Sequence, residues 1–147
     1  MVKLSPNQPC FCQSGKKYKK CCRPYLEGKQ YPSTPETLVR ARFVSYALRN
    51  NAFIMESTHP ESPNFVKDEK RWNVQLDAYT LRNMFMDLEI LSAEDDKVSY
   101  RARIVEFGTN IREYIEHANF KQEDGKWLYV DGEIVDVPKV SESEASE

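Results

Sequence analysis

Four cysteines within the first 22 residues constrain this chain more than any other feature of its sequence. They have the spacing C-x-C-x8-C-C, so they form two close pairs that a short segment separates. A disulfide between adjacent or next-but-one residues is strained, whereas two close pairs can direct four sulfur atoms toward one metal ion. Three interpretations of the four cysteines remain: a metal site, disulfides or a redox pair, and free thiols. We favour a metal site with one structural Zn²⁺. Its predicted ligands are Cys10, Cys12, Cys21 and Cys22.

The remaining sequence is consistent with a reducing compartment. The N-terminus has no apolar run of signal-peptide length, and no segment approaches the roughly 18–20 apolar residues of a membrane helix. We therefore expect a soluble cytoplasmic protein that does not bind membranes, in which stable disulfides are rare. The length of 147 residues suits one ordinary domain with a small appendage.

Charge divides the chain into a basic head and an acidic body. Residues 1–23 carry six basic side chains and no acidic one, so the other 15 basic side chains face all 23 acidic ones. The segment 16–20 is predicted to form about one and a half helical turns, with Ser14 as N-cap and Gly15 in the preceding turn. Its lysines either only neutralise the thiolates or form a surface that binds a partner. The candidate partner-binding residues are Lys16, Lys17, Tyr18, Lys19 and Lys20.

The run Cys-Phe-Cys-Gln-Ser-Gly-Lys-Lys-Tyr-Lys-Lys-Cys-Cys at residues 10–22 resembles the SEC-C motif. This small zinc-binding module is also found at the C-terminus of the SecA translocation motor. The motif usually begins Cys-Pro-Cys-Gly-Ser-Gly, so Phe11 and Gln13 depart from it in the turn and not at the metal ligands. Further similarity to the YchJ-like family lies in Arg-Pro-Tyr-Leu-Glu-Gly (23–28), in residues 37–47 and 58–60, and in Gly-Lys-Trp-Leu-Tyr-Val-Asp-Gly (125–132).

This resemblance implies a domain organisation and a partner class. In the YchJ-like family a SEC-C motif precedes a domain that resembles nuclear transport factor 2, a strongly curved sheet wrapped around helices. We therefore expect a zinc knuckle at residues 1–30, a nuclear transport factor 2-like domain at 31–138 and a disordered acidic tail at 139–147. The similarity to the SecA tail implies docking on protein-export or ribosome machinery, with a SecB-like chaperone or the ribosome as partner.

The pattern of the residues themselves predicts the same α+β fold. Thr34 and Pro35 indicate the start of a helix, followed by a short helix at about 52–58 and a third at 66–80. The pattern then changes to strands that hairpin-loop compositions separate. Helices followed by a strand meander favour helices packed on one face of a curved antiparallel sheet. The predicted strands are 85–92, 97–107, 111–121 and 126–131.

No catalytic residue is predicted. His59 before a proline suits capping or packing, and His117 within a strand suits a half-buried structural position. Glu113 and Glu116 face opposite sides of their strand, and we expect each to pair with an arginine across strands, although one of them could face a pocket. An enzyme or small-ligand carrier that uses a pocket of the cone-shaped domain is the alternative function. Because the body is acidic, we do not expect sequence-specific DNA binding.

Overall fold

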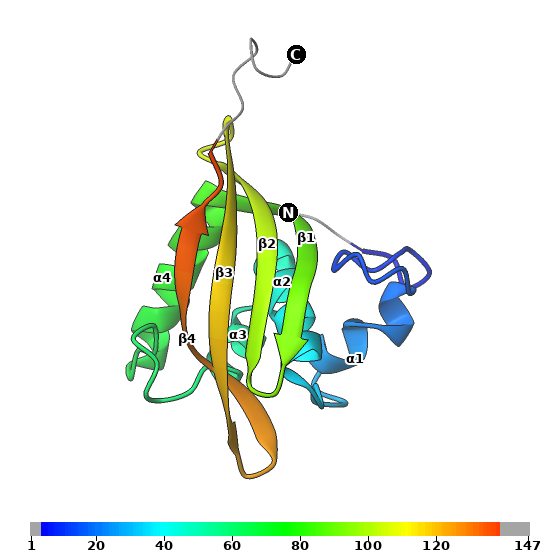
Figure 1. Ribbon diagram of the computed structural model, residues 1–147, viewed down its shortest axis with the longest axis vertical. Coiled ribbons are helices and arrows are strands. Elements are labelled where there is room, and N and C mark those ends of the chain that lie inside the picture. Colours follow the sequence, from blue (N-terminus) through cyan, green and yellow to red (C-terminus); the bar gives the residue numbers. More distant parts are fainter. Residues whose placement is uncertain (1–3, 139–147) are drawn as a thin grey trace.

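The computed structural model describes residues 4–138, which form an α+β fold. Four strands in the order β1-β2-β3-β4 make one antiparallel sheet, and helices cover one of its faces (Figure 1). The predicted fold class is confirmed, while the predicted acidic tail lies outside the described residues. The strands are β1 (Asn83–Glu94), β2 (Lys97–Glu106), β3 (Asn110–Glu123) and β4 (Lys126–Asp136).

Capping side chains determine where the longer helices begin. The hydroxyl of Thr34 accepts from the amide of Thr37 at 3.1 Å, and the carboxylate of Asp68 accepts from the amide of Arg71 at 3.2 Å. These side chains stabilise the first turns, because the first amides of a helix lack an intrahelical partner.

None of the helices in the described part of the chain has the length and apolar composition of a membrane span. The helical elements are η1 (Tyr18–Lys20), α1 (Arg23–Leu26), α2 (Pro35–Leu48), α3 (Asn51–Glu56) and α4 (Glu69–Arg82).

Short turns connect the four strands in sequence order. The β1–β2 turn contains two residues between Glu94 and Lys97, which are register partners. Each of the three turns has a residue in the left-handed region near φ +50°, namely Asp95, Phe107 and Asp124. Left-handed turn residues match the twist of antiparallel strands, so the chain forms a simple meander.

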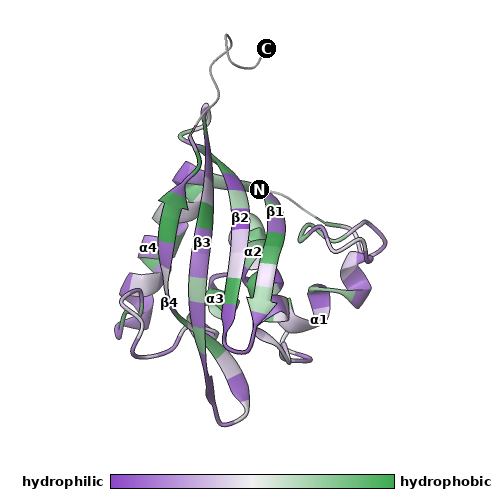
Figure 2. Ribbon diagram, in the orientation of Figure 1, coloured by the Kyte–Doolittle hydropathy of each residue, from purple (hydrophilic) through white to green (hydrophobic). Residues whose placement is uncertain are grey.

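Polar and apolar residues alternate along the strands, as Figure 2 shows by colour. The inner face carries buried residues such as Phe85, Ala102 and Tyr114, which pack toward the helices. The opposite face carries charged pairs such as Arg103 with Asp87. This two-sided pattern is typical of an antiparallel sheet with one face on the core.

The cysteine-containing segment, residues 8–22, is called the knuckle below, and it shares a hydrophobic core with the rest of the protein. One buried cluster contains Cys10 and Tyr18 of the knuckle together with Leu38, Phe43 and Phe85. Figure 1 shows the knuckle beside β1, the first strand of the sheet. The knuckle therefore packs directly against the body, which comprises the remaining described residues.

Candidate metal centre

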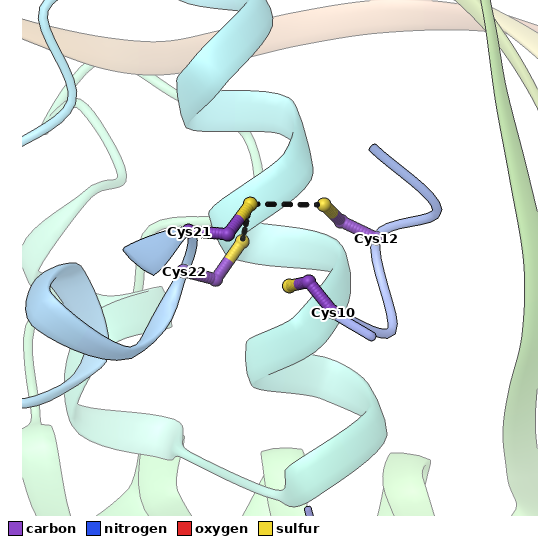
Figure 3. Close-up of side chains that lie close together, drawn as sticks. All are labelled: Cys10, Cys12, Cys21 and Cys22. Carbon is purple, nitrogen blue, oxygen red and sulfur yellow. Dashed lines mark hydrogen bonds between the residues drawn. The ribbon is translucent and has the colours of Figure 1, made fainter. Parts of the chain in front are cut away.

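A loop and a turn bring the four cysteines together. Cys10 and Cys12 lie in the loop before η1, Cys21 follows η1, and Cys22 directly precedes α1. The amide of Cys10 donates to the carbonyl of Lys16 at 2.8 Å, which folds the loop back on itself. Both cysteine pairs consequently meet on the same side of the knuckle, in front of α2 (Figure 3).

The sulfur atoms have the spacing of a four-coordinate metal site. All four Sγ atoms lie within 4.8 Å of one another, with 3.5 Å between Cys12 and Cys21 and 4.0 Å between Cys21 and Cys22. A tetrahedral zinc ion with Zn–S bonds of about 2.3 Å places its sulfur ligands about 3.8 Å apart. All four thiols are free, and three of the four cysteines are buried. The cluster can therefore hold a metal ion.

Without a metal ion, the thiols shift one another's pKa values. The side-chain hydrogen bond with Cys10 lowers the pKa of Cys12 far below its ordinary value and lowers the pKa of Cys21 to about 6. The hydrogen bonds among the same thiols raise the pKa of Cys10 and of Cys22. A cation that binds to this cluster has to displace the thiol protons, so its affinity depends on pH.

The lysine segment does not form the predicted helix of one and a half turns. Only Tyr18–Lys20 is helical, as a single 3₁₀ turn, while Lys17 is extended with φ −67° and ψ 144°. The amide of Tyr18 donates to the carbonyl of Gln8 at 2.8 Å, and Pro9 pairs with Lys17 in an antiparallel bridge. The prediction was wrong here because the backbone before Tyr18 pairs with the preceding loop.

Ser14 likewise caps no helix. Its hydroxyl accepts from the amide of Lys16 at 3.2 Å and lies 3.1 Å from Sγ of Cys21. The next residue, Gly15, has φ +87°, which a residue with a Cβ adopts only with strain. Ser14 and Gly15 together turn the chain sharply between the two cysteine pairs.

The five candidate partner-binding residues divide into one buried residue and four exposed residues. Tyr18 is only 8% exposed and packs in the cluster that contains the cysteines. Within residues 4–138, the lysines that make ion pairs are Lys29, Lys121 and Lys126, none of which belongs to the knuckle. The exposed and unpaired side chains are Lys16, Lys17, Lys19 and Lys20.

Two family models match the chain. The model described as the YchJ middle NTF2-like domain matches residues 34–132, and the SEC-C motif matches residues 7–24. The chain belongs to the YchJ family. The two matched ranges correspond to the body and to the knuckle of the structure, so the resemblance noted from the sequence is confirmed.

Curated YchJ-family relatives match over most of their length. A UPF0225 protein of Deinococcus radiodurans is 32% identical over 126 residues, which cover 86% of this chain and 89% of the relative. The UPF0225 protein YchJ of Shigella dysenteriae is 27% identical over 132 residues, which cover 86% of this chain and 83% of the relative. Both relatives therefore align with most of this chain.

Two solved structures have a similar fold. The solution structure of a SEC-C motif containing protein from Rhodopseudomonas palustris has a TM-score of 0.73 at 30% identity. The match covers 88% of this chain and all of that chain. A crystal structure of a SEC-C motif containing protein from Psychrobacter arcticus has a TM-score of 0.64 at 18% identity, covering 92% and 86%, and supports the fold alone.

Phe11 and Gln13, where this YchJ-family chain departs from the usual SEC-C motif, attach the knuckle to the body. The ring of Phe11 stacks on Phe43 of α2, with centroids 5.8 Å apart and planes at 17°. Gln13 Nε2 donates to the carboxylate of Asp87 at 3.0 Å, and the amide of Leu88 donates to Gln13 Oε1 at 3.4 Å. No local sequence pattern indicates the contacts of Gln13, because its partners are more than 70 positions away.

A third contact connects the cysteine loop to α2. Arg40 Nη1 donates to the carbonyl of Cys12 at 2.8 Å, while its Nε lies 3.5 Å from a carboxylate oxygen of Glu36 one turn earlier. Arginine can make both contacts because its guanidinium group carries five N–H donors. The cysteine loop is thus attached to both α2 and β1.

Glu116 is a buried carboxylate in the body. Glu116 is 6% exposed on the inner face of β3, where the hydroxyls of Tyr100 and Tyr129 donate to its two oxygens, Tyr129 at 2.5 Å. The expectation that it pairs with an arginine across strands was wrong, because its face of the strand is the covered one. Glu113 lies on the opposite face and is half-buried.

The two histidines occupy different environments. His59 is buried: its Nδ1 accepts from the amide of Glu61 at 3.0 Å, and its Nε2 lies 2.8 Å from a carboxylate oxygen of Glu123. His117 is exposed, with Nδ1 2.7 Å from the hydroxyl of Ser99, so the expectation of a half-buried position was wrong. These contacts connect each histidine to a neighbouring segment of the body.

Proposed function

We propose that this YchJ-family chain is a cytoplasmic zinc-containing adaptor whose knuckle docks on an acidic protein surface of the protein-export or ribosome machinery. The observation that carries the proposal is the set of exposed, unpaired lysines around the buried Tyr18. If the lysines served only to keep the protein in solution, there would be no need for a buried Tyr18 among them. A binding surface benefits from this buried anchor, because side chains on a fixed backbone lose less entropy on binding.

Zinc is the metal that best suits the cysteine cluster. The SEC-C match and the four closely spaced thiols support one Zn²⁺ held by Cys10, Cys12, Cys21 and Cys22. Four protein ligands leave no position for water or substrate, so the ion has a structural role. Zinc with four thiolates carries a net charge of about −2, which nearby lysines offset in part.

The lysine surface acts mainly by electrostatic attraction. Exposed charges that lie more than about 10 Å apart are screened in 0.1 M salt, so the attraction weakens as the ionic strength increases. Complementary charge mainly raises the association rate and excludes partners of the wrong charge. We therefore expect binding to an acidic partner to be fast at low salt and markedly weaker at moderate salt.

The test replaces the four knuckle lysines by glutamine and measures binding to purified SecB chaperone and to ribosomes at low and moderate salt. The matched control replaces four exposed basic residues outside the knuckle, K29Q, K67Q, K70Q and R71Q, and so makes the same change in net charge. Retained zinc in both variants shows that the metal centre is intact.

The proposal predicts that the knuckle variant loses at least about tenfold in affinity for one of the two partners, while the control stays within about threefold of the parent. If the knuckle variant binds as tightly as the parent, its lysines only neutralise the metal centre. If both variants lose binding equally, net charge and not the knuckle surface determines the association. Either result would overturn the proposal.

A further inference from the structure

A cavity of about 530 Å³ lies in the body, between the helices and the inner face of the sheet. This volume is in the range of pockets that bind small molecules. The Glu116 carboxylate and its two tyrosine donors, Tyr100 and Tyr129, line the cavity. No residue of the knuckle contributes to its wall in the described part of the chain, so the site is separate from the metal centre.

The Glu116 carboxylate has hydrogen-bond donors but no cationic partner within residues 4–138. Burial raises the pKa of both Tyr100 and Tyr129, so each phenol remains a protonated donor at neutral pH. Each carboxylate oxygen accepts one phenol hydrogen bond and has lone-pair capacity for another donor. A buried carboxylate without a cation is costly, and a positively charged ligand group would offset that cost.

Aromatic rings form a large part of the cavity wall. Tyr46 stacks on Phe85 with centroids 5.0 Å apart, and Tyr79 packs against both rings. Among the described residues, the hydroxyls of Tyr46, Tyr79 and Tyr114 have no hydrogen-bond partner, although all three residues line the cavity. Aromatic faces attract cations, and a phenol oxygen accepts hydrogen bonds, so this wall suits an N–H donor with a positive charge.

Two arginines, Arg42 and Arg82, also line the cavity. Arg42 Nη1 already donates to the carbonyl of Ile54 and to the hydroxyls of Ser57 and Thr58, at 2.7–3.2 Å. The Arg42 guanidinium covers the ring of Tyr129, 4.7 Å from its centroid, and so belongs to the packed wall. Arg82 is exposed. A ligand carboxylate next to Glu116 would be repelled by it, whereas an ammonium group at the same position would be attracted.

We propose that this cavity binds a small amine, with an apolar ring-sized body against the aromatic wall and an ammonium head on Glu116. Gly132 on β4 makes this position of the carboxylate feasible. A Cβ at residue 132 would overlap the carboxylate of Glu116, so any side chain there would displace it. Two features therefore determine where the Glu116 carboxylate lies. Two phenols donate hydrogen bonds to it, and Gly132 on the neighbouring strand has no side chain that would displace it.

The test uses three probes with the same aromatic body and different head groups: 2-phenylethylamine, 2-phenylethanol and 3-phenylpropionate. Each is titrated into the zinc-loaded protein while the amide resonances of cavity residues such as Phe120 and Tyr129 are followed. The variants are Glu116→Gln, which removes the charge, and Gly132→Ala, which retains the carboxylate but moves it. The control is Glu113→Gln, on the opposite face of the same strand.

The amine should bind about tenfold more tightly than the alcohol, and the propionate should not shift the cavity resonances. Glu116→Gln and Gly132→Ala should each weaken amine binding about tenfold and alter alcohol binding by less than about threefold. Glu113→Gln should bind all three probes as the parent does. Gly132→Ala tests the charge position even if Glu116→Gln does not fold.

Three outcomes would overturn the proposal. The propionate could bind as tightly as the amine, which would make the cavity a site for anions or for apolar bodies in general. Both variants could retain the affinity of the parent for the amine, which would limit Glu116 to a structural hydrogen-bond network. The third outcome is that none of the probes shifts a cavity resonance at about 5 mM, which would show that the cavity lacks the affinity expected of a specific amine site.

Discussion

Gln13 lies at the junction where the knuckle contacts β1 of the body. Replacing it separates two opposing effects on stability, the strain of its backbone and the hydrogen bonds of its side chain. Its backbone lies in the left-handed region at φ +64°, which costs a residue with a Cβ about 1–2 kcal/mol. Its side-chain amide donates to the carboxylate of Asp87 at 3.0 Å and to the carbonyl of Met86 at 3.3 Å, and it accepts from the amide of Leu88 at 3.4 Å. Because Gln13 is exposed and two of these contacts are long, we assign the three hydrogen bonds about 1 kcal/mol together.

Two substitutions at this position should have different effects. Gln13→Ala loses the hydrogen bonds and keeps the backbone strain, so the free energy of unfolding should fall by about 1 kcal/mol. Gln13→Gly loses the same hydrogen bonds but relieves the backbone strain. Glycine also has more conformational entropy in the unfolded chain, which cancels part of the stability gained from the relief of strain. The remaining gain offsets the loss of the hydrogen bonds. The glycine variant should therefore be more stable than the alanine variant by about 1 kcal/mol.

The assay is urea denaturation of the zinc-loaded protein at a fixed concentration of free zinc, followed by tryptophan fluorescence. Gln30→Ala, at an exposed position outside the junction, is the control and should leave the transition unchanged. Equal stability of the glycine and alanine variants, or lower stability of the glycine variant, would refute the reasoning about backbone strain. Unchanged stability of the alanine variant would show that the contacts with β1 contribute nothing.

Three further predictions concern the junction, the metal and the tyrosines. Arg40→Ala should lower the free energy of unfolding by about 1 kcal/mol in the same urea assay, because the Cys12 carbonyl loses a donor at 2.8 Å; an unchanged transition would contradict this. Chelation should abolish the chemical-shift dispersion of residues 8–25, alter Phe43 through the shared core, and leave 126–136 nearly unchanged. Loss of dispersion throughout would instead show that the body requires the metal. Burial raises the pKa of Tyr79 to about 12, so its contribution to stability is complete below about pH 10 and is lost as the pH rises through about 12. Phenolate absorbance should therefore rise at higher pH in the folded than in the unfolded chain, and coincident curves would contradict this.

Features that depend on neighbouring residues could be predicted from the sequence. Thr34 caps α2 as expected, because a hydroxyl before a helix bonds to an amide three residues later. The third helix begins at Glu69, three residues after the predicted start, because Asp68 provides its cap. The four cysteines converge as their spacing indicated. Each of these features depends on contacts within about a dozen residues.

Features that depend on strand register could not be predicted in the same way. Period-two alternation places Glu113 and Glu116 on opposite faces, but it does not show which face the helices cover. Tyr100 reaches Glu116 because the β2–β3 register makes them direct partners, and Tyr129 reaches it from the next strand. The predicted helix at residues 16–20 was wrong for a related reason. The amide of Tyr18 donates to the carbonyl of Gln8 and is therefore not available for a hydrogen bond within a helix.

The metal content of the reduced protein tests the knuckle most directly. Native mass spectrometry should show about one zinc per chain, and X-ray absorption at the zinc edge should show four sulfur ligands at about 2.3 Å. Cys12→Ser should reduce the sulfur count by one and weaken zinc binding, because one thiolate is lost. A reduced protein that binds no zinc, or a zinc ion with mainly nitrogen and oxygen ligands, would contradict a metal centre built from Cys10, Cys12, Cys21 and Cys22.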